Sequence, residues 1–152
     1  MTTVYTLNED VARAVQSLVQ MNEDAAEGFT KASEVVDDPE LAGMFRTAAL
    51  ERRRLRDECE AILEGSSEPV PDGGTVVGMA HRWWMDLRGR LTGEESKALL
   101  QEVDRGEAAL LTAYEEAAAR SDIAELDDML ERHIESVRTT RDRMNALESS
   151  SN

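Results

Sequence analysis

The sequence has few of the residues that cross-link or interrupt a chain. It contains one cysteine and three prolines among 152 residues, and aromatic residues make up only 4%. One cysteine, Cys59, excludes an internal disulfide, and its helical spacing from Leu55 and Ile62 predicts an inert buried thiol. Abundant Ala, Glu, Leu and Arg with so little proline favour long helices over sheet.

Long hydrophobic runs and excess positive charge are also missing. No stretch approaches the roughly 20 apolar residues that span a bilayer, and the first residues, MTTVYTLNED, lack the layout of a secretory signal. Lys and Arg number 17 against 32 Asp and Glu, which gives a net charge of −15. We expect a soluble, cytoplasmic protein. Because its negative charge repels the polyanionic backbone of nucleic acids and anionic lipid surfaces, we expect it to bind neither nucleic acid nor a membrane.

Helix-start signals divide the chain into four long helices. Capping-box patterns and one Asp-Pro start occur at Thr6-x-x-Glu9, Asp38-Pro39, Thr92-x-x-Glu95 and Asp122-x-x-Glu125. They predict helices over about 6–37, 39–64, 94–120 and 122–148. The short turns within each pair make two antiparallel helical hairpins.

The segment 65–93 joins the two hairpins. It opens with the loop EGSSEPVPDGGT and continues into TVVGMAHRWWMDLRGRL, whose apolar residues recur at helical spacing. A shift of 85 positions also aligns parts of the hairpins, for example Met44 with Met129, although chance similarity between amphipathic helices explains this equally well. The pattern predicts an all-α, ferritin-like four-helix bundle with a long crossover containing a short extra helix. We expect one domain over 1–152, ordered over 5–148.

A polar layer is predicted halfway along the bundle. Asn22 lies seven residues from Val15 and from Phe29, and Glu107 lies seven residues from Leu100 and from Tyr114. Glu51 lies among apolar residues near the middle of the second helix. Burying a lone carboxylate costs several kcal/mol, so these glutamates require a partner.

The pattern is close to that of a di-iron bundle but lacks most of the ligands. Such bundles carry one Glu on each of two helices and Glu-x-x-His on each of the others. Here only Glu51 and Glu107 match, while Asn22, Arg54, Ser136 and Thr139 stand at the four remaining positions. We therefore expect no catalysis and no cofactor. Instead, we predict a guanidinium–carboxylate layer made of Asn22, Glu51, Arg54, Glu107 and Ser136.

A different rotation of the fourth helix gives a competing hypothesis. If that helix turns by one position, an iron, manganese or zinc site becomes conceivable. Its ligands would be Glu51, Glu107, Glu131, His133 and Glu135.

Two further groups of residues point to surfaces. Adjacent helical residues point about 100° apart, so only one of Trp83 and Trp84 can cover the bundle, and the other is expected to contact a protein partner or a second copy in a homodimer. The arginines in ALERRRLRDE are expected to form surface pairs with acidic residues of neighbouring helices: Arg52, Arg53, Arg54 and Arg56.

Four stretches carry a family resemblance: EGFTKASEVVDDPELAGMF, ALERRRLRDE, HRWWMDLRGRLTG and VDRGEAALLTAYEEA. Between Leu7 and Leu147 the chain resembles an uncharacterised bacterial family of ferritin-like four-helix-bundle proteins, catalogued as a domain of unknown function. The resemblance implies the ferritin-like fold but no reaction. Relatives in the wider superfamily bind iron and are often linked to stress, so we expect a non-enzymatic structural or interaction module with a link to stress.

Overall fold

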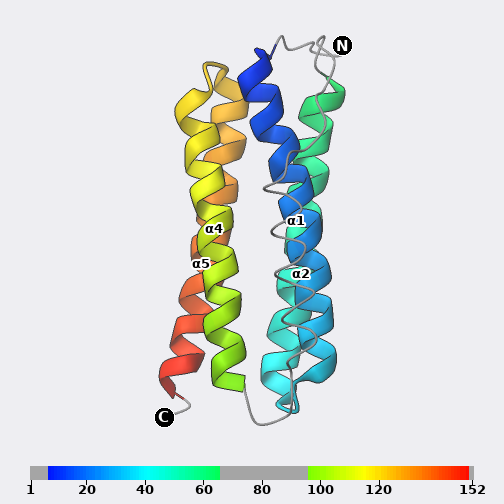
Figure 1. Cartoon of the computed structure of the whole chain (residues 1–152), viewed down its shortest axis with the longest axis vertical. Coiled ribbons are helices and arrows are strands. Elements are labelled where there is room, and N and C mark those ends of the chain that lie inside the picture. Colours follow the sequence, from blue (N-terminus) through cyan, green and yellow to red (C-terminus); the bar gives the residue numbers. More distant parts are fainter. Residues whose placement is uncertain (1–6, 66–95, 151–152) are drawn as a thin grey trace.

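The computed structural model describes residues 7–65 and 96–150. All regular structure within these residues is helical: α1 Glu9–Val35, α2 Pro39–Glu64, α4 Ser96–Arg120 and α5 Ala124–Ser150 (Figure 1). For the described part of the chain, the prediction of an all-helical fold with four long helices is confirmed. None of the described helices is long and apolar enough to cross a membrane.

Side chains at the helix starts explain the observed boundaries. Asp38 Oδ1 accepts a hydrogen bond from the Glu40 amide at 3.0 Å, and Pro39 opens α2 at the residue that was predicted. At α1 the cap is Asn8, whose Oδ1 accepts from the Val11 amide at 2.9 Å, so this helix begins three residues later than the predicted residue 6.

The helices form two antiparallel hairpins that pack side by side (Figure 1). α1 packs against both α2 and α4, and α5 packs against α4, whereas α2 and α5 have the fewest contacts among these neighbouring pairs. α2 ends at one end of the bundle and α4 begins at the opposite end (Figure 1). The bundle is therefore more open along α2 and α5 than along its other sides.

The apolar core is divided into two clusters. The upper cluster lies in the half of the bundle that contains the α4–α5 turn, which is at the top of Figure 1, and the lower cluster lies in the half that contains the α1–α2 turn, at the bottom. The main residues of the upper cluster are Val11, Val15, Leu18, Leu55, Cys59, Leu63, Leu110, Tyr114, Leu126, Met129, Leu130, Ile134 and Val137. Those of the lower cluster are Ala25, Phe29, Ala32, Leu41, Phe45, Ala48, Ala49, Leu99, Leu100, Val103 and Met144.

Buried polar residues lie between the two clusters on each of the four described helices. They include Asn22 on α1, Arg52 on α2, Glu107 on α4 and Thr140 on α5. We call these four residues the polar layer. It lies at the middle of the bundle and defines the candidate site.

The predicted crossover loop and short extra helix lie outside the described residues, as do Trp83 and Trp84.

Candidate functional site: a polar layer in the bundle core

A buried ion pair lies at the centre of the polar layer. Arg52 of α2 and Glu107 of α4 are both 0% exposed. Arg52 Nε donates to Glu107 Oε1 at 3.1 Å and to Oε2 at 3.4 Å, and Arg52 Nη2 also donates to Oε1. The Arg52 guanidinium carbon lies 6.0 Å from the centre of the Phe29 ring. Each of the two charges is thus paired with a fixed opposite charge, which is the condition for burying an ion pair in a bundle core.

The sequence positions explain why these two side chains point inward. Arg52 lies seven residues from Phe45 and seven from Cys59, and all three are fully buried on α2. Glu107 lies between Val103 and Leu110 of α4, which are also buried. Residues seven apart share one helix face, so each helix presents one charged group among apolar neighbours at the same level.

A chain of hydrogen bonds lies beside this pair and connects α1, α4, α5 and α2. Asn22 Nδ2 donates to Tyr114 Oη at 2.8 Å, and Tyr114 Oη lies 2.8 Å from His133 Nδ1. His133 Nε2 lies 3.0 Å from Glu58 Oε2, and Arg132 Nη1 donates to Glu58 Oε1 at 3.0 Å. The chain runs from the core to the half-exposed carboxylate of Glu58.

The direction of each hydrogen bond follows from its partners. Asn22 Nδ2 also donates to the Leu18 carbonyl at 2.9 Å, which can only accept, so the amide nitrogen faces both Leu18 and Tyr114. Tyr114 Oη therefore accepts from Asn22 and donates to His133 Nδ1, since the alternative acceptor, Cys59 Sγ, is 3.8 Å away. His133 then carries its proton on Nε2 and donates it to Glu58.

Burial sets the protonation of this chain. Loss of solvent lowers the pKa of His133 below 6.5, although the Glu58 carboxylate opposes this shift. Partial burial acts to raise the pKa of Glu58, but the hydrogen bonds from Arg132 and His133 outweigh it, and the net pKa is lowered from 4.5. At neutral pH the hydrogen-bonded chain therefore contains the neutral imidazole of His133 and the ionised carboxylate of Glu58.

The Tyr114 phenol of this hydrogen-bonded chain and the neighbouring Cys59 thiol stay protonated. Burial raises the pKa of the Cys59 thiol to about 12, and it raises that of the Tyr114 phenol well above 10. Cys59 is therefore a neutral buried thiol and not a thiolate nucleophile at neutral pH.

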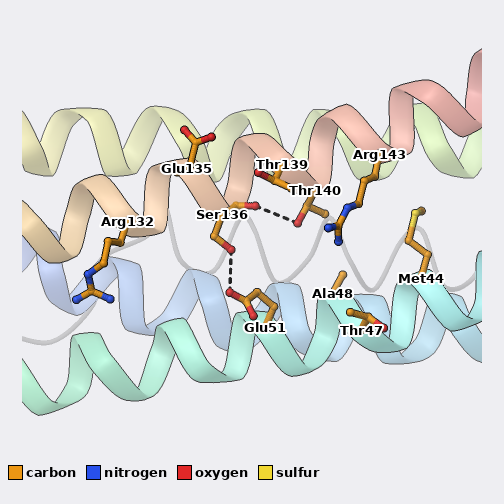
Figure 2. Close-up of a pocket in the computed structure, with 10 residues that line it drawn as sticks. All are labelled: Met44, Thr47, Ala48, Glu51, Arg132, Glu135, Ser136, Thr139, Thr140 and Arg143. Atoms are coloured by element: carbon orange, nitrogen blue, oxygen red, sulfur yellow. Dashed lines mark hydrogen bonds between the residues drawn. The ribbon is translucent and has the colours of Figure 1, made fainter.

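A groove of about 530 Å³ separates α2 from α5 beside the polar layer (Figure 2). Glu51 and Ser136 point toward each other across it, and Ser136 Oγ donates to Glu51 Oε1 at 2.9 Å. Thr140 Oγ1 donates to the Ser136 carbonyl at 3.1 Å. The groove is lined by Met44, Thr47, Ala48, Glu51, Arg132, Glu135, Ser136, Thr139, Thr140 and Arg143.

The structure corrects the predicted position of the core arginine. The Arg54 side chain is 69% exposed and pairs at 2.9 Å with Glu51, whose side chain is 30% exposed, so this pair lies at the edge of the groove. The arginine inside the bundle is Arg52, which was expected on the surface. Adjacent positions differ by about 100° on a helix, and the apolar face of α2 is wide enough for either position to be read as inward.

The residues of the alternative metal site do not converge. Glu131 and Glu135 are exposed, both oxygens of Glu107 contact Arg52, and both ring nitrogens of His133 are hydrogen-bonded. Among residues 7–65 and 96–150, no group of three or more His, Cys, Asp or Glu side chains is placed to hold a metal ion.

The fold and the site define the class of protein. It is a helical bundle whose core contains a buried ion pair and a chain of hydrogen bonds. The chain belongs to the family described as a domain of unknown function, DUF2383, which matches residues 10–120. Asn22, Arg52, Glu107 and Tyr114 lie within the matched part, while His133 lies beyond it. No curated protein and no solved structure matches the chain.

Proposed function

We propose that the protein is a non-catalytic, ferritin-like bundle in which Arg52 takes the place that metal ions hold in di-iron members of this fold. It acts as a structural or interaction module in the cytoplasm, with a link to stress. The observation that carries this proposal is the ion pair of Arg52 with both oxygens of Glu107 inside the core.

The arrangement of the helices supports the ferritin-like assignment. Two antiparallel hairpins pack together, and α2 ends at the opposite end of the bundle from the start of α4 (Figure 1). The long crossover of ferritin-like folds joins helix ends that are placed in this way.

Charge balance supports the loss of metal binding. An arginine guanidinium remains cationic at any physiological pH, so it supplies permanently the positive charge that a metal ion would bring to Glu107. A divalent metal would have to displace Arg52 and leave the guanidinium buried without its partner. It would also find too few donors, because such metals need several carboxylate or imidazole ligands.

The chemistry of the remaining core supports a role without catalysis. Cys59 and Tyr114 stay protonated, and His133 is held between two hydrogen-bond partners, so the described core contains no activated nucleophile. The partner that we propose is a protein or a second copy of this chain, bound through the segment that carries Trp83 and Trp84; nucleic acid and membranes are not proposed partners.

Metal analysis of protein purified without chelator tests this function. We expect iron, manganese and zinc each far below one equivalent per chain, and a urea midpoint that EDTA does not change. About one equivalent or more that disappears in Glu107→Ala would overturn the proposal in favour of a metal-binding protein. Glu115→Ala is the matched control, because it removes an exposed carboxylate from the same helix.

A further inference from the structure

Polar side chains join α2 to α5 at two levels. Glu58 of α2 contacts Arg132 and His133 of α5, each at 3.0 Å. One heptad earlier on α2, Glu51 accepts from Ser136 at 2.9 Å. Both connections end on a carboxylate of α2, so acid can act on this seam directly.

The helices are packed least closely at the same seam. α2 and α5 have the fewest contacts of the neighbouring helix pairs, and the groove of about 530 Å³ runs between them (Figure 2). Local opening of a protein takes place where little apolar surface holds two elements together. The polar connections therefore contribute a larger share of the cohesion here than between α1 and α2.

The surroundings of His133 make its charged form unfavourable in the closed seam. A second proton on Nδ1 would face Tyr114 Oη of α4, which would then have to turn its own hydrogen toward Cys59 Sγ of α2, 3.8 Å away. The guanidiniums of Arg52 and Arg132 also oppose a positive charge.

Within residues 7–65 and 96–150, one neighbouring group favours that charge. It is the carboxylate of Glu58 on α2, while α1 contributes the uncharged amide of Asn22 on the far side of Tyr114.

We propose that His133 and Glu58 form an acid-sensitive latch, in which proton uptake by His133 favours a state where α5 has separated from α2 along the groove. The proton stays on the imidazole, which reaches water in the open state. This regulatory role is separate from the function proposed above, since it rests on the contacts of His133 with Tyr114 and Glu58 and not on the ion pair of Arg52 with Glu107.

The sign of the effect follows from linkage. In the closed state burial lowers the pKa of His133, whereas in the open state it returns toward 6.5. The latch is therefore at full strength above about pH 6.5, and it weakens as the pH falls from 6.5 toward the closed-state pKa. Within that window the opening constant rises by up to about tenfold per pH unit.

Hydrogen exchange of the full chain between pH 7.5 and 5.5 tests the latch. After correction for the chemical exchange rate, amides of α5 around His133 and of α2 around Glu58 should exchange up to about tenfold faster per pH unit below 6.5. Amides of α1 that face α4 should keep their protection. His133→Gln, which keeps a hydrogen-bonding side chain but does not titrate, should lose this response, and His81→Gln, which removes the other histidine, should keep it.

Several outcomes would overturn the proposal. They are protection of α5 that does not change with pH, an unchanged response in His133→Gln, a lost response in His81→Gln, or equal loss of protection in all helices. If His133→Gln does not fold, the ring nitrogens of the unaltered protein decide by NMR. A proton on Nε2 and titration below pH 6.5 support the latch, and any other tautomer or titration at 6.5 or above contradicts it.

Discussion

Replacing Arg52 with methionine should destabilise the protein far more than any change to a surface arginine. Methionine keeps an unbranched stem among the same apolar neighbours but removes every donor that Arg52 directs at Glu107. Both residues are fully buried, so the carboxylate is left in the core without its counter-charge. Removing one partner of such a pair costs about 3–5 kcal/mol of unfolding free energy.

A double substitution distinguishes a charge effect from a packing effect. Arg52→Met with Glu107→Leu removes both charges and leaves an apolar layer of similar volume, a change that is often neutral or stabilising in buried pairs. We therefore expect the double variant to recover most of the stability that either single variant loses.

Urea unfolding followed by far-UV circular dichroism at pH 7.5 provides the measurement. The matched control is Arg13→Met, because Arg13 pairs with Glu9 at 2.8 Å but both side chains are more than half exposed. Its expected loss is below about 1 kcal/mol. A loss of less than about 1 kcal/mol for Arg52→Met, or losses that simply add in the double variant, would show that the buried ion pair does not contribute in this way.

Four further predictions concern the network and the surface. Arg54→Leu should change stability by less than about 0.5 kcal/mol in the same urea assay, because the side chain is largely exposed; a loss like that of Arg52→Met would contradict its placement. Tyr114→Phe should cost roughly 1–3 kcal/mol, since it leaves Asn22 and His133 without their shared hydroxyl, and a neutral result would argue against the chain. Cys59, buried and with a pKa of about 12, should react with a disulfide reagent at pH 8 only in urea, and rapid labelling of the folded protein would disprove its burial. Glu58→Gln should reduce stability at pH 7, and the difference from the unaltered protein should shrink as the pH falls below about 4.5, because the lowered pKa of Glu58 stabilises the fold only above that range; a difference that does not vary with pH would exclude this contribution.

Local sequence signals were sufficient to predict the helices. Apolar residues at helical spacing and the Asp38-Pro39 start placed α2 at the residues where it is found. The start of α1 was placed too early, because Thr6 and Asn8 both suit a cap and only the structure shows that Asn8 accepts from Val11. The segment 66–95 lies outside the described residues, so the predicted crossover helix stays a prediction.

The site could be predicted in kind but not in detail. Spacing of seven residues from apolar neighbours was enough to expect Asn22 and Glu107 in the core. The same signal exists for Arg52, seven residues from Phe45 and from Cys59, but Glu51 has comparable apolar neighbours in the adjacent register. One helix cannot decide between them, because the choice depends on how α2 is rotated against α4.

Sequence patterns could not predict the contacts between the two hairpins. Glu58 and His133 are 75 residues apart, and the hydroxyl of Tyr114 meets His133 only because α4 and α5 pack with a particular relative rotation. Packing of side chains between helices sets that rotation, and the spacing of apolar residues within a single helix does not reveal it.

We propose that a guanidinium holds the middle of this bundle in place of a metal ion. Anomalous diffraction from crystals grown with manganese tests it most directly. We expect electron density for the Arg52 guanidinium against both oxygens of Glu107, with no anomalous peak beside Glu107 or Glu51. An anomalous peak within bonding distance of Glu107, with Arg52 displaced from it, would show that a metal ion occupies the middle of the bundle.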